Sequence, residues 1–287
     1  MTLLFAHNHY QAFPSAVVSM HDRGHTLGDG VYEYIVAWRG RLIDIDPHLD
    51  RLYRSLQEAK INNAIGRSAL RLKIIDFCRQ NHLQNGGLYL QLTRGSAVRD
   101  HYYSQHLKPN LTMLVKHYRI EDREKILTDG IVVKTHNDFR WQRRDIKVIS
   151  LIANCIAKQW AEDNGAREVA FFNDDDVISE GGSSNLWLVD KDGVLRTHMA
   201  NYEILNGITK LLVEKISQQQ GIKLEWRAFS RKEAYDGKEM FLTSSSQLAL
   251  PIVMLDDKKI GTGQRGDLTA KIQSAIMAEM LKQPILL

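Results

Sequence analysis

The sequence predicts an α+β fold built from two domains. Its length of 287 residues suits two modest domains or one large one. Short apolar segments that alternate with polar positions predict antiparallel strands, and amphipathic segments between them predict packed helices. The polar stretch IEDREKILTDG interrupts this pattern and predicts a linker at residues 120–124. We therefore expect a small α+β domain at residues 1–119 and a larger domain at residues 125–287.

The first domain is expected to contain a hairpin, two helices and two further strands. The segment VYEYIVAWRGRLIDID predicts the hairpin, with Arg39 and Gly40 at the turn. Because proline suits the first turn of a helix, Pro47 marks the start of the helix predicted by PHLDRLYRSLQEAKI. The second helix is predicted by RSALRLKIIDFCRQNHL, and the two strands by GGLYLQLTRG and NLTMLVKHYR.

The second domain is expected to begin with the strand IVVKTHN. The segment SLIANCIAKQWAEDNG predicts a helix that packs through Ile152, Ile156 and Trp160 and stops at Gly165. Residues 168–197 predict several antiparallel strands with aspartate-rich turns. A further helix, a pair of strands joined by a hydroxyl-rich loop, and a closing helix are predicted by GITKLLVEKISQQQG, EMFLTSSSQLALPIVML and GDLTAKIQSAIMAEML.

The composition is that of an ordinary globular protein with a mild basic excess. Hydrophobic residues make up 44% of the chain, charged residues 25%, and the net charge is +4. A nucleic-acid binder would carry a stronger basic stripe. The one basic cluster, RWQRR, is short and has no interleaved aromatic residue beyond Trp141. We therefore expect no nucleic-acid partner, with a basic binding module as the alternative from another functional class.

The cysteines and the N-terminus indicate the compartment. Cys78 and Cys155 show neither the spacing of a metal site nor a disulfide framework, which fits a reducing environment and no metal. The segment MTLLFAHNHY lacks the basic flank of a secretory signal, and no stretch is long enough to span a membrane. We expect a cytoplasmic protein that has no membrane partner.

One lysine lies in an apolar segment, which makes it a candidate for chemistry. In RRDIKVISLIANC, Lys147 alternates with Ile146 and Val148, a pattern that predicts a strand. An amine held partly out of water loses proton affinity and becomes a nucleophile. The commoner alternative is a lysine that extends its ammonium group to solvent or pairs with a carboxylate.

Two segments could bind an anion such as phosphate. In LNGITK, a glycine precedes a helix start, where backbone N–H groups and the helix dipole favour negative charge, and Thr209 adds a hydroxyl. In FLTSSSQ, Ser244, Ser245 and Ser246 offer hydroxyls and turn amides at the end of a strand. An ordinary helix start and an ordinary polar loop are the commoner alternatives for these two patterns.

Two other segments could bind charged groups of a ligand. In SEGGSSN, Glu180 precedes two glycines that would let the backbone approach a flat ligand, although a solvated turn carboxylate is the commoner case. In VRDHYY, Arg99 and His101 point the same way if the backbone is extended, which suits a carboxylate, unless this is a basic surface loop. With Lys147, these are the parts of a pyridoxal-phosphate enzyme.

Six motifs in order resemble the fold-type IV aminotransferases that depend on pyridoxal 5'-phosphate. They are DRGHTLGDGVYEYI, PHLDRLYRSL, RWQRRDIKVISLIANCIAKQWAEDNG, SEGGSSNLWLV, ILNGIT and LTSSSQ. The resemblance covers nearly the whole chain and is closest to the D-amino acid (D-alanine) aminotransferase branch. It implies the two-domain α+β fold of that family, with the pyridoxal-phosphate site between the domains.

The resemblance also implies roles for individual residues. Lys147 matches the lysine that bonds to the cofactor and moves the substrate proton, and Glu180 matches the carboxylate that keeps the pyridine nitrogen protonated. The phosphate would be held by Arg51, Ile208, Thr209, Ser244 and Ser245, and the ring would pack against Leu205. Tyr32, Arg99 and His101 match the group that holds the substrate carboxylate.

The Arg-x-His pair decides the branch. It implies a D-amino acid as substrate and a 2-oxo acid, 2-oxoglutarate or pyruvate, as acceptor. In the family this loop reaches in from the neighbouring subunit, so a homodimer is implied. The alternatives within the fold are an L-branched-chain aminotransferase and an aminodeoxychorismate lyase. Tyr34, Gly182 and Gln247 depart from the D-aminotransferase pattern and bear on substrate range rather than on reaction class.

Overall fold

The computed structural model describes residues 2–6, 9–12, 17–62, 65–119 and 121–287. The chain forms two compact units. The first consists of Met1–Arg119, Ile146–Ser150 and Gln283–Leu287, and the second consists of Ile120–Asp145 and Leu151–Lys282. One short segment from the middle of the chain and another from its C-terminus therefore join the first unit. The expected domains and linker remain a prediction: residues 121–124 begin a helix, and Ile120 lies outside the described residues.

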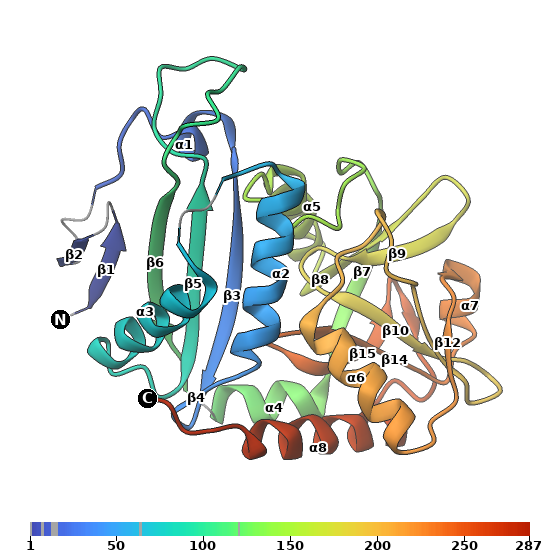
Figure 1. Ribbon diagram of the computed structural model, residues 1–287. Helices are drawn as coiled ribbons and strands as arrows, with labels where there is room; N and C mark the ends of the chain where they lie inside the picture. The colour runs from blue at the N-terminus through green and yellow to red at the C-terminus, as the bar shows by residue number, and fades with distance from the viewer. Residues whose placement is uncertain (1, 7–8, 13–16, 63–64, 120) are drawn as a thin grey trace. The chain divides into compact units, whose positions relative to one another are not determined.

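The first unit contains a six-stranded antiparallel sheet in the order β2-β1-β6-β5-β3-β4 (Figure 1). Its strands are β1 (Leu3–Ala6), β2 (His9–Ala12), β3 (Gly30–Trp38), β4 (Arg41–Leu42), β5 (Gly86–Thr93) and β6 (Asn110–His117). Its helices are α1 (Arg23–Leu27), α2 (Ile45–Glu58) and α3 (Arg67–Gln80). The predicted hairpin is confirmed: Arg39 and Gly40 both have positive φ, as a two-residue turn between twisted strands requires.

Alternation along β3 divides the first sheet into a core face and a polar face. Val31, Ile35 and Ala37 belong to the hydrophobic core, which α2 and α3 complete on one face of the sheet (Figure 1). On the other face lie half-buried side chains that are mostly aromatic and polar: Tyr32, Tyr34, Tyr89 and Gln91. This second face is the one on which Lys147 lies.

The second unit contains a larger mixed sheet in the order β12-β11-β10-β14-β15-β7-β8-β9-β13, with β16 paired to β15. Its strands are β7 (Ile131–Asn137), β8 (Glu168–Phe172), β9 (Val177–Gly181), β10 (Asn185–Val189), β11 (Leu195–Thr197), β12 (Leu224–Trp226), β13 (Phe229–Ser230), β14 (Glu239–Ser244), β15 (Leu248–Leu255) and β16 (Lys258–Lys259). The predicted antiparallel pairs β8–β9, β10–β11 and β14–β15 are confirmed. The sequence did not predict the parallel pairs that β7 makes with β8 and β15.

Helices cover both faces of the second sheet. They are α4 (Glu121–Asp129), α5 (Ile152–Asp163), α6 (Ile208–Gln219), α7 (Arg231–Tyr235) and α8 (Asp267–Lys282). On β8, Val169 and Phe171 pack with α5, whereas Ala170 between them belongs to the opposite core. The period of two along a strand thus separates the two cores. Among the described residues, no helix is long and apolar enough to cross a membrane.

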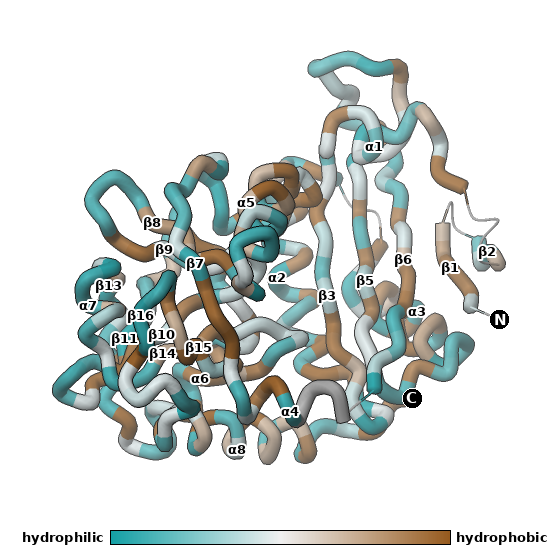
Figure 2. Tube along the Cα trace, turned by 180° about the vertical axis from the view of Figure 1, so that it is seen from behind, coloured by the Kyte–Doolittle hydropathy of each residue, from teal (hydrophilic) through white to brown (hydrophobic). Residues whose placement is uncertain are grey.

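The packing face predicted for α5 is wrong. Ile152 is 76% exposed and Ile156 is 55% exposed, whereas Ala157 and Ala161 are buried against the sheet. Small side chains let the helix approach β8 closely, so Ile152 and Ile156 remain on its exposed side. Figure 2 shows the hydrophobic stretches of α5 in brown. The helix ends at Asp163, and Gly165 follows with φ of 76°, as predicted for the stop.

The strand predicted at Lys147 is also wrong. Residues 146–150 are irregular, with only one isolated bridge, between Val148 and Val31 of β3. Ile146 is buried in the core of the first unit, so its side chain anchors the segment there. A single bridge beside β3 satisfies a few backbone groups without extending the sheet.

Candidate active site

Lys147 is fixed by its backbone and lies beside an aromatic ring. The Tyr32 N–H donates to the Lys147 carbonyl over 3.0 Å, and the Ile149 N–H donates to the Gly30 carbonyl over 3.1 Å. The Lys147 Nζ lies 4.1 Å from the centre of the Tyr32 ring, which stacks on Tyr89. This contact holds a half-buried amine next to a tyrosine, two residues that the sequence assigned to the same site.

Arg51 lies on α2 and is held by a buried carboxylate. Its Nε and Nη2 donate to the two oxygens of Glu33 over 2.7 and 2.8 Å, and His48 Nδ1 lies 2.7 Å from the same carboxylate. Burial opposes charge on Glu33, but Arg51 and His48 outweigh it and lower its pKa to about 2. This bidentate pair sets the direction of the Arg51 guanidinium. Its role at a phosphate stays a prediction.

Arg99 and His101 lie on the long loop between β5 and β6. The structure has bends at both residues, so the extended backbone assumed for this pair is wrong. Both side chains are exposed, and neither has a hydrogen bond or ion pair within the described part of the chain. The loop thus presents an arginine and an imidazole outward, and their role at a substrate carboxylate stays a prediction.

Glu180 is the last residue but one of β9 and is buried, so it is not the solvated carboxylate of the commoner case. It is 5% exposed, its Oε1 accepts from Arg140 Nη1 over 2.6 Å, and its Oε2 accepts from the Leu205 N–H over 2.9 Å. Burial raises the pKa of Glu180, and the donors from Arg140 and Leu205 offset only part of that effect. A carboxylate has room for one more donor, so Glu180 can face a protonated ring nitrogen.

The arginines of the basic cluster RWQRR form ion pairs with carboxylates of the second unit. Arg140 pairs with Asp138 and Glu180, Arg144 lies 3.4 Å from Asp138, and Arg143 pairs with Asp145. The Arg140 guanidinium also lies 4.2 Å from the centre of a phenylalanine ring. Because these charges are neutralised by neighbouring carboxylates, they do not form the solvent-facing stripe of a nucleic-acid binder.

The predicted anion site at the start of α6 has the required backbone. Gly207 is the N-cap residue and supplies no side chain, so the first N–H groups of the helix are not capped from that position. Thr209 in the first turn is buried. A Cβ on Gly207 would lie 2.1 Å from Asn185 Oδ1, so a larger residue here would displace the Asn185 amide. Ser244 and Ser245 lie where β14 ends.

Asn185 connects Glu180 to the segment before α6 and to the end of β14, and the sequence analysis did not identify it. Its amide donates to the Leu205 carbonyl over 2.8 Å and lies 3.4 Å from Glu180 Oε2. On β10 it pairs with Thr243, the residue before Ser244. One buried amide thus connects the carboxylate, the helix start and the serine loop. It stands last in the motif SEGGSSN, where a polar residue opening a buried strand could have identified it.

Each unit by itself carries groups that suit part of a cofactor. The second unit holds a buried carboxylate and an anion site linked by Asn185, which fits a ring nitrogen and a phosphate on one molecule. The first unit holds the lysine, a fixed arginine and the exposed Arg99 and His101.

The glycines that follow Glu180, Gly181 and Gly182, allow close packing. A Cβ on Gly182 would come within 2.8 Å of Glu168 Oε1.

The chain is similar to known aminotransferases over nearly its whole length. Residues 30–255 match the amino-transferase class IV family. The D-alanine aminotransferase of Bacillus licheniformis is 36% identical over 266 residues, 93% of each chain, and that of Staphylococcus haemolyticus is 34% identical over 275 residues, 95% of this chain and 96% of the relative.

Solved structures share the fold at lower identity. The branched-chain amino acid aminotransferase of Escherichia coli superposes with a TM-score of 0.89 at 20% identity, covering 96% of this chain and 94% of that one. A T.th. branched-chain amino acid aminotransferase with pyridoxamine 5'-phosphate also has a TM-score of 0.89 at 20% identity, covering 99% and 95%. The α+β fold-type IV prediction is confirmed, and the chain belongs to the class IV aminotransferases, which use pyridoxal 5'-phosphate.

Proposed function

We propose that the protein transfers the amino group of a D-amino acid such as D-alanine to a 2-oxo acid, either 2-oxoglutarate or pyruvate. The observation that carries this proposal is the Lys147 amine beside the Tyr32 ring, because it joins the reacting amine to a residue expected at the substrate carboxylate. The relatives named D-alanine aminotransferase, at 33–36% identity, favour the D-enantiomer.

One cofactor would engage residues of both units. Lys147 and Arg51 would serve from the first unit, as the covalent anchor and as a phosphate contact. The second unit would supply its carboxylate, ring-packing and phosphate contacts: Glu180, Leu205, Ile208, Thr209, Ser244 and Ser245. This arrangement gives each charged part of the cofactor a group of opposite charge or a set of N–H donors.

The reaction needs a base, an electron acceptor and a substrate clamp. Pyridoxal phosphate, when bound, supplies the electron-withdrawing ring that stabilises negative charge at the substrate α-carbon. The amine of Lys147 removes the α-proton as general base. Glu180, with Arg140 and the Leu205 N–H fixing its orientation, holds the proton on the ring nitrogen. Tyr32, Arg99 and His101 bind the carboxylate and orient the α-proton toward the lysine.

We further propose that the protein works as a homodimer in the cytoplasm. The outward side chains of Arg99 and His101 would then bind the substrate held by a second copy of the chain. The pairing can be tested by mixing Lys147→Ala and Arg99→Ala proteins. At a substrate concentration far below the KM of Arg99→Ala, where that variant alone turns over little, random exchange of subunits should restore about a quarter of wild-type activity, because half of the dimers would contain one intact site. If Arg99 serves its own chain, no activity returns.

The second candidate is an L-branched-chain aminotransferase. The solved structures that superpose on the chain carry that name, but at about 20% identity they favour the fold alone. The two candidates differ in which enantiomer enters the site, and therefore in which substrate changes the cofactor spectrum.

The test is the visible absorption spectrum of the purified protein with D-alanine and, in a parallel cuvette, with L-leucine. We expect a yellow protein that loses its visible band with D-alanine and keeps it with L-leucine. A response to L-leucine alone would support the second candidate. A protein that stays colourless after incubation with pyridoxal phosphate would refute both.

A further inference from the structure

A buried arginine holds the backbone of the loop that carries Arg99 and His101. Arg23, the first residue of α1, is 3% exposed. Its Nη1 donates to the Asp100 carbonyl over 2.6 Å and to the Tyr102 carbonyl over 3.2 Å, and its Nη2 donates to the His101 carbonyl over 3.4 Å. One planar guanidinium thus binds three consecutive carbonyls, which fixes the local course of the chain.

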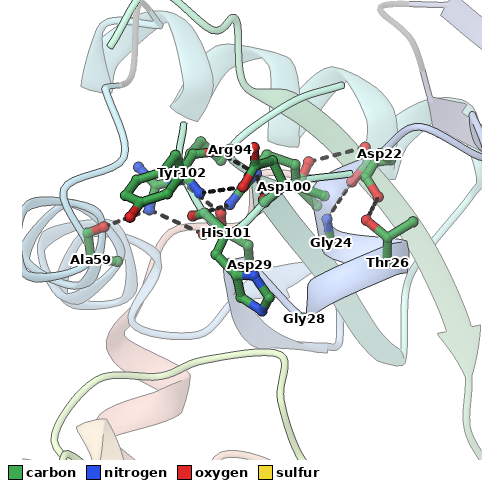
Figure 3. Close-up of polar contacts among 12 residues, drawn as sticks. Asp22, Gly24, Thr26, Gly28, Asp29, Ala59, Arg94, Asp100, His101 and Tyr102 are labelled. Atoms are coloured by element: carbon green, nitrogen blue, oxygen red, sulfur yellow. Dashed lines mark hydrogen bonds and ion pairs between the residues drawn. The ribbon is translucent and has the colours of Figure 1, made fainter. Parts of the chain in front are cut away.

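A second arginine and one carboxylate fix Arg23 in turn. Asp29 Oδ2 accepts from Arg23 Nε and from Arg94 Nε, each over 2.8 Å. Arg94 Nη2 donates to Asp29 Oδ1 over 3.0 Å (Figure 3). Burial opposes charge on Asp29, but Arg94 and Arg23 lower its pKa below the ordinary value. Arg94 also donates to the carbonyls of Ala59 and Lys60 at the end of α2. Asp29 therefore remains ionised between two buried guanidinium groups.

The same residues connect the loop to the segment that carries the lysine. Asp29 precedes β3, and its carbonyl accepts from the Arg94 N–H over 3.1 Å. The preceding residue, Gly28, accepts a hydrogen bond at its carbonyl from Ser150 Oγ over 2.8 Å, and Ser150 lies three residues after Lys147. The fixed backbone at Asp100–Tyr102 (Figure 3) contrasts with the exposed side chains of Arg99 and His101. A rigid backbone under outward side chains is what a preformed ligand clamp needs.

We propose that Arg23 is a positioning residue: held by Asp29 and Arg94, it fixes the loop backbone so that Arg99 and His101 are preset for the substrate carboxylate. The role of this clamp rests on the proposed function. Arg23 does not touch substrate in this account and acts only through the loop. Because a D-amino acid and a 2-oxo acid both bind through a carboxylate, loosening the loop should weaken both.

The test compares Arg23→Lys with Arg67→Lys. Lysine keeps the charge but cannot span three carbonyls and a carboxylate, whereas Arg67 makes ion pairs with Asp46 and Asp50 on the exposed surface of the same unit. We expect Arg23→Lys to raise KM for D-alanine and for the 2-oxo acid by about 10-fold with a smaller change in kcat. Arg67→Lys should leave both constants unchanged. Equal KM values for the two variants would overturn the proposal.

Two further measurements separate positioning from a general loss of structure. Amide hydrogen exchange at residues 99–103 should be about 10-fold faster in Arg23→Lys, while β5 and β6 keep their protection. In an Arg99→Ala background, Arg23→Lys should raise KM little further, because both changes act on one contact. Fully additive effects, or unchanged exchange in the loop, would refute the role.

The exchange measurement needs no substrate, so it also distinguishes this inference from the proposed function. If the wild-type protein does not transaminate D-alanine but Arg23→Lys loosens the loop, the proposed function is wrong and the positioning of the loop stands. If Arg23→Lys does not fold, Asp29→Asn takes its place, because it keeps the side-chain shape and removes the charge between the two arginines. It should change KM and loop exchange in the same direction, and no change in either would overturn the proposal.

Discussion

Replacing Glu33 by glutamine should destabilise the first unit strongly and in a pH-dependent way. Glu33 is fully buried on β3 and accepts from both Arg51 and His48. Its pKa falls from an ordinary 4.5 to about 2, and this shift corresponds to about 3 kcal/mol of folding free energy at neutral pH. Glutamine keeps the size of the side chain but leaves the buried Arg51 without its counter-charge, a change that costs about 3–5 kcal/mol in other proteins.

The sign of the pH dependence follows from the lowered pKa. A depressed carboxyl pKa stabilises the fold at pH values above 4.5, and this contribution disappears as the pH falls toward 2. A protonated glutamate resembles glutamine, so the stability difference between wild type and Glu33→Gln should shrink over that window. Burial lowers the pKa of His48 despite the neighbouring Glu33, so His48 adds no positive charge at neutral pH.

Urea unfolding at several pH values measures this difference, with amide exchange on β3 and α2 to assign it to the first unit. Asp50→Asn is the matched control, because it removes a carboxylate that is 66% exposed and pairs with Arg67. We expect this control to cost less than about 1 kcal/mol. A Glu33→Gln loss as small as the control, or a loss that stays constant down to pH 3, would refute the reasoning.

Three further predictions concern the lysine, the carboxylate and α5. Lys147→Ala should abolish transamination of D-alanine while the midpoint of thermal unfolding of the apo protein changes little; near wild-type turnover would contradict its role. Arg140→Met should weaken cofactor binding about 10-fold or more, measured by titration of the apo protein, because Glu180 loses its nearest donor. Ala161→Leu should destabilise by about 1–3 kcal/mol in urea unfolding through overpacking, whereas Ile156→Ala on the exposed side should cost under about 1 kcal/mol; equal losses would contradict the observed packing.

The sequence predicted correctly those turns and helices whose formation depends on residues within a few positions of one another. The turn at Arg39–Gly40 and the helix over Ile45–Glu58 appear where their residues place them, because the hairpin turn and the apolar stripe each depend on neighbours within a few positions. The face of α5 depends instead on how closely the helix can approach β8. The sequence pattern contains both the alanine face and the isoleucine face, and only the sheet selects between them.

In the candidate site too, residues marked by a local motif could be predicted, whereas residues defined by distant partners could not. Glu180 could be identified because glycines follow it, but its burial and its contacts with Arg140 and Asn185 arise from β9, β10 and the segment before Lys147 meeting in three dimensions. Arg23 and Asp29 were not identified, because their partners lie about seventy residues away on the loop between β5 and β6. Long-range ion pairs leave no periodic trace in a sequence.

The apolar residues around Lys147 explain why an ammonium group lies between them. Residues 146–150 belong to the first unit, whereas the chain on either side of them belongs to the second. A segment of five residues can be held in another unit only by strong local anchors. Ile146 supplies one by burial, Val148 a second by its bridge to Val31, and the Lys147 carbonyl a third by accepting from Tyr32. The isoleucine and valine therefore do not bury the amine. They fix the backbone from which it extends, so that a flexible side chain starts from a defined point beside the Tyr32 ring.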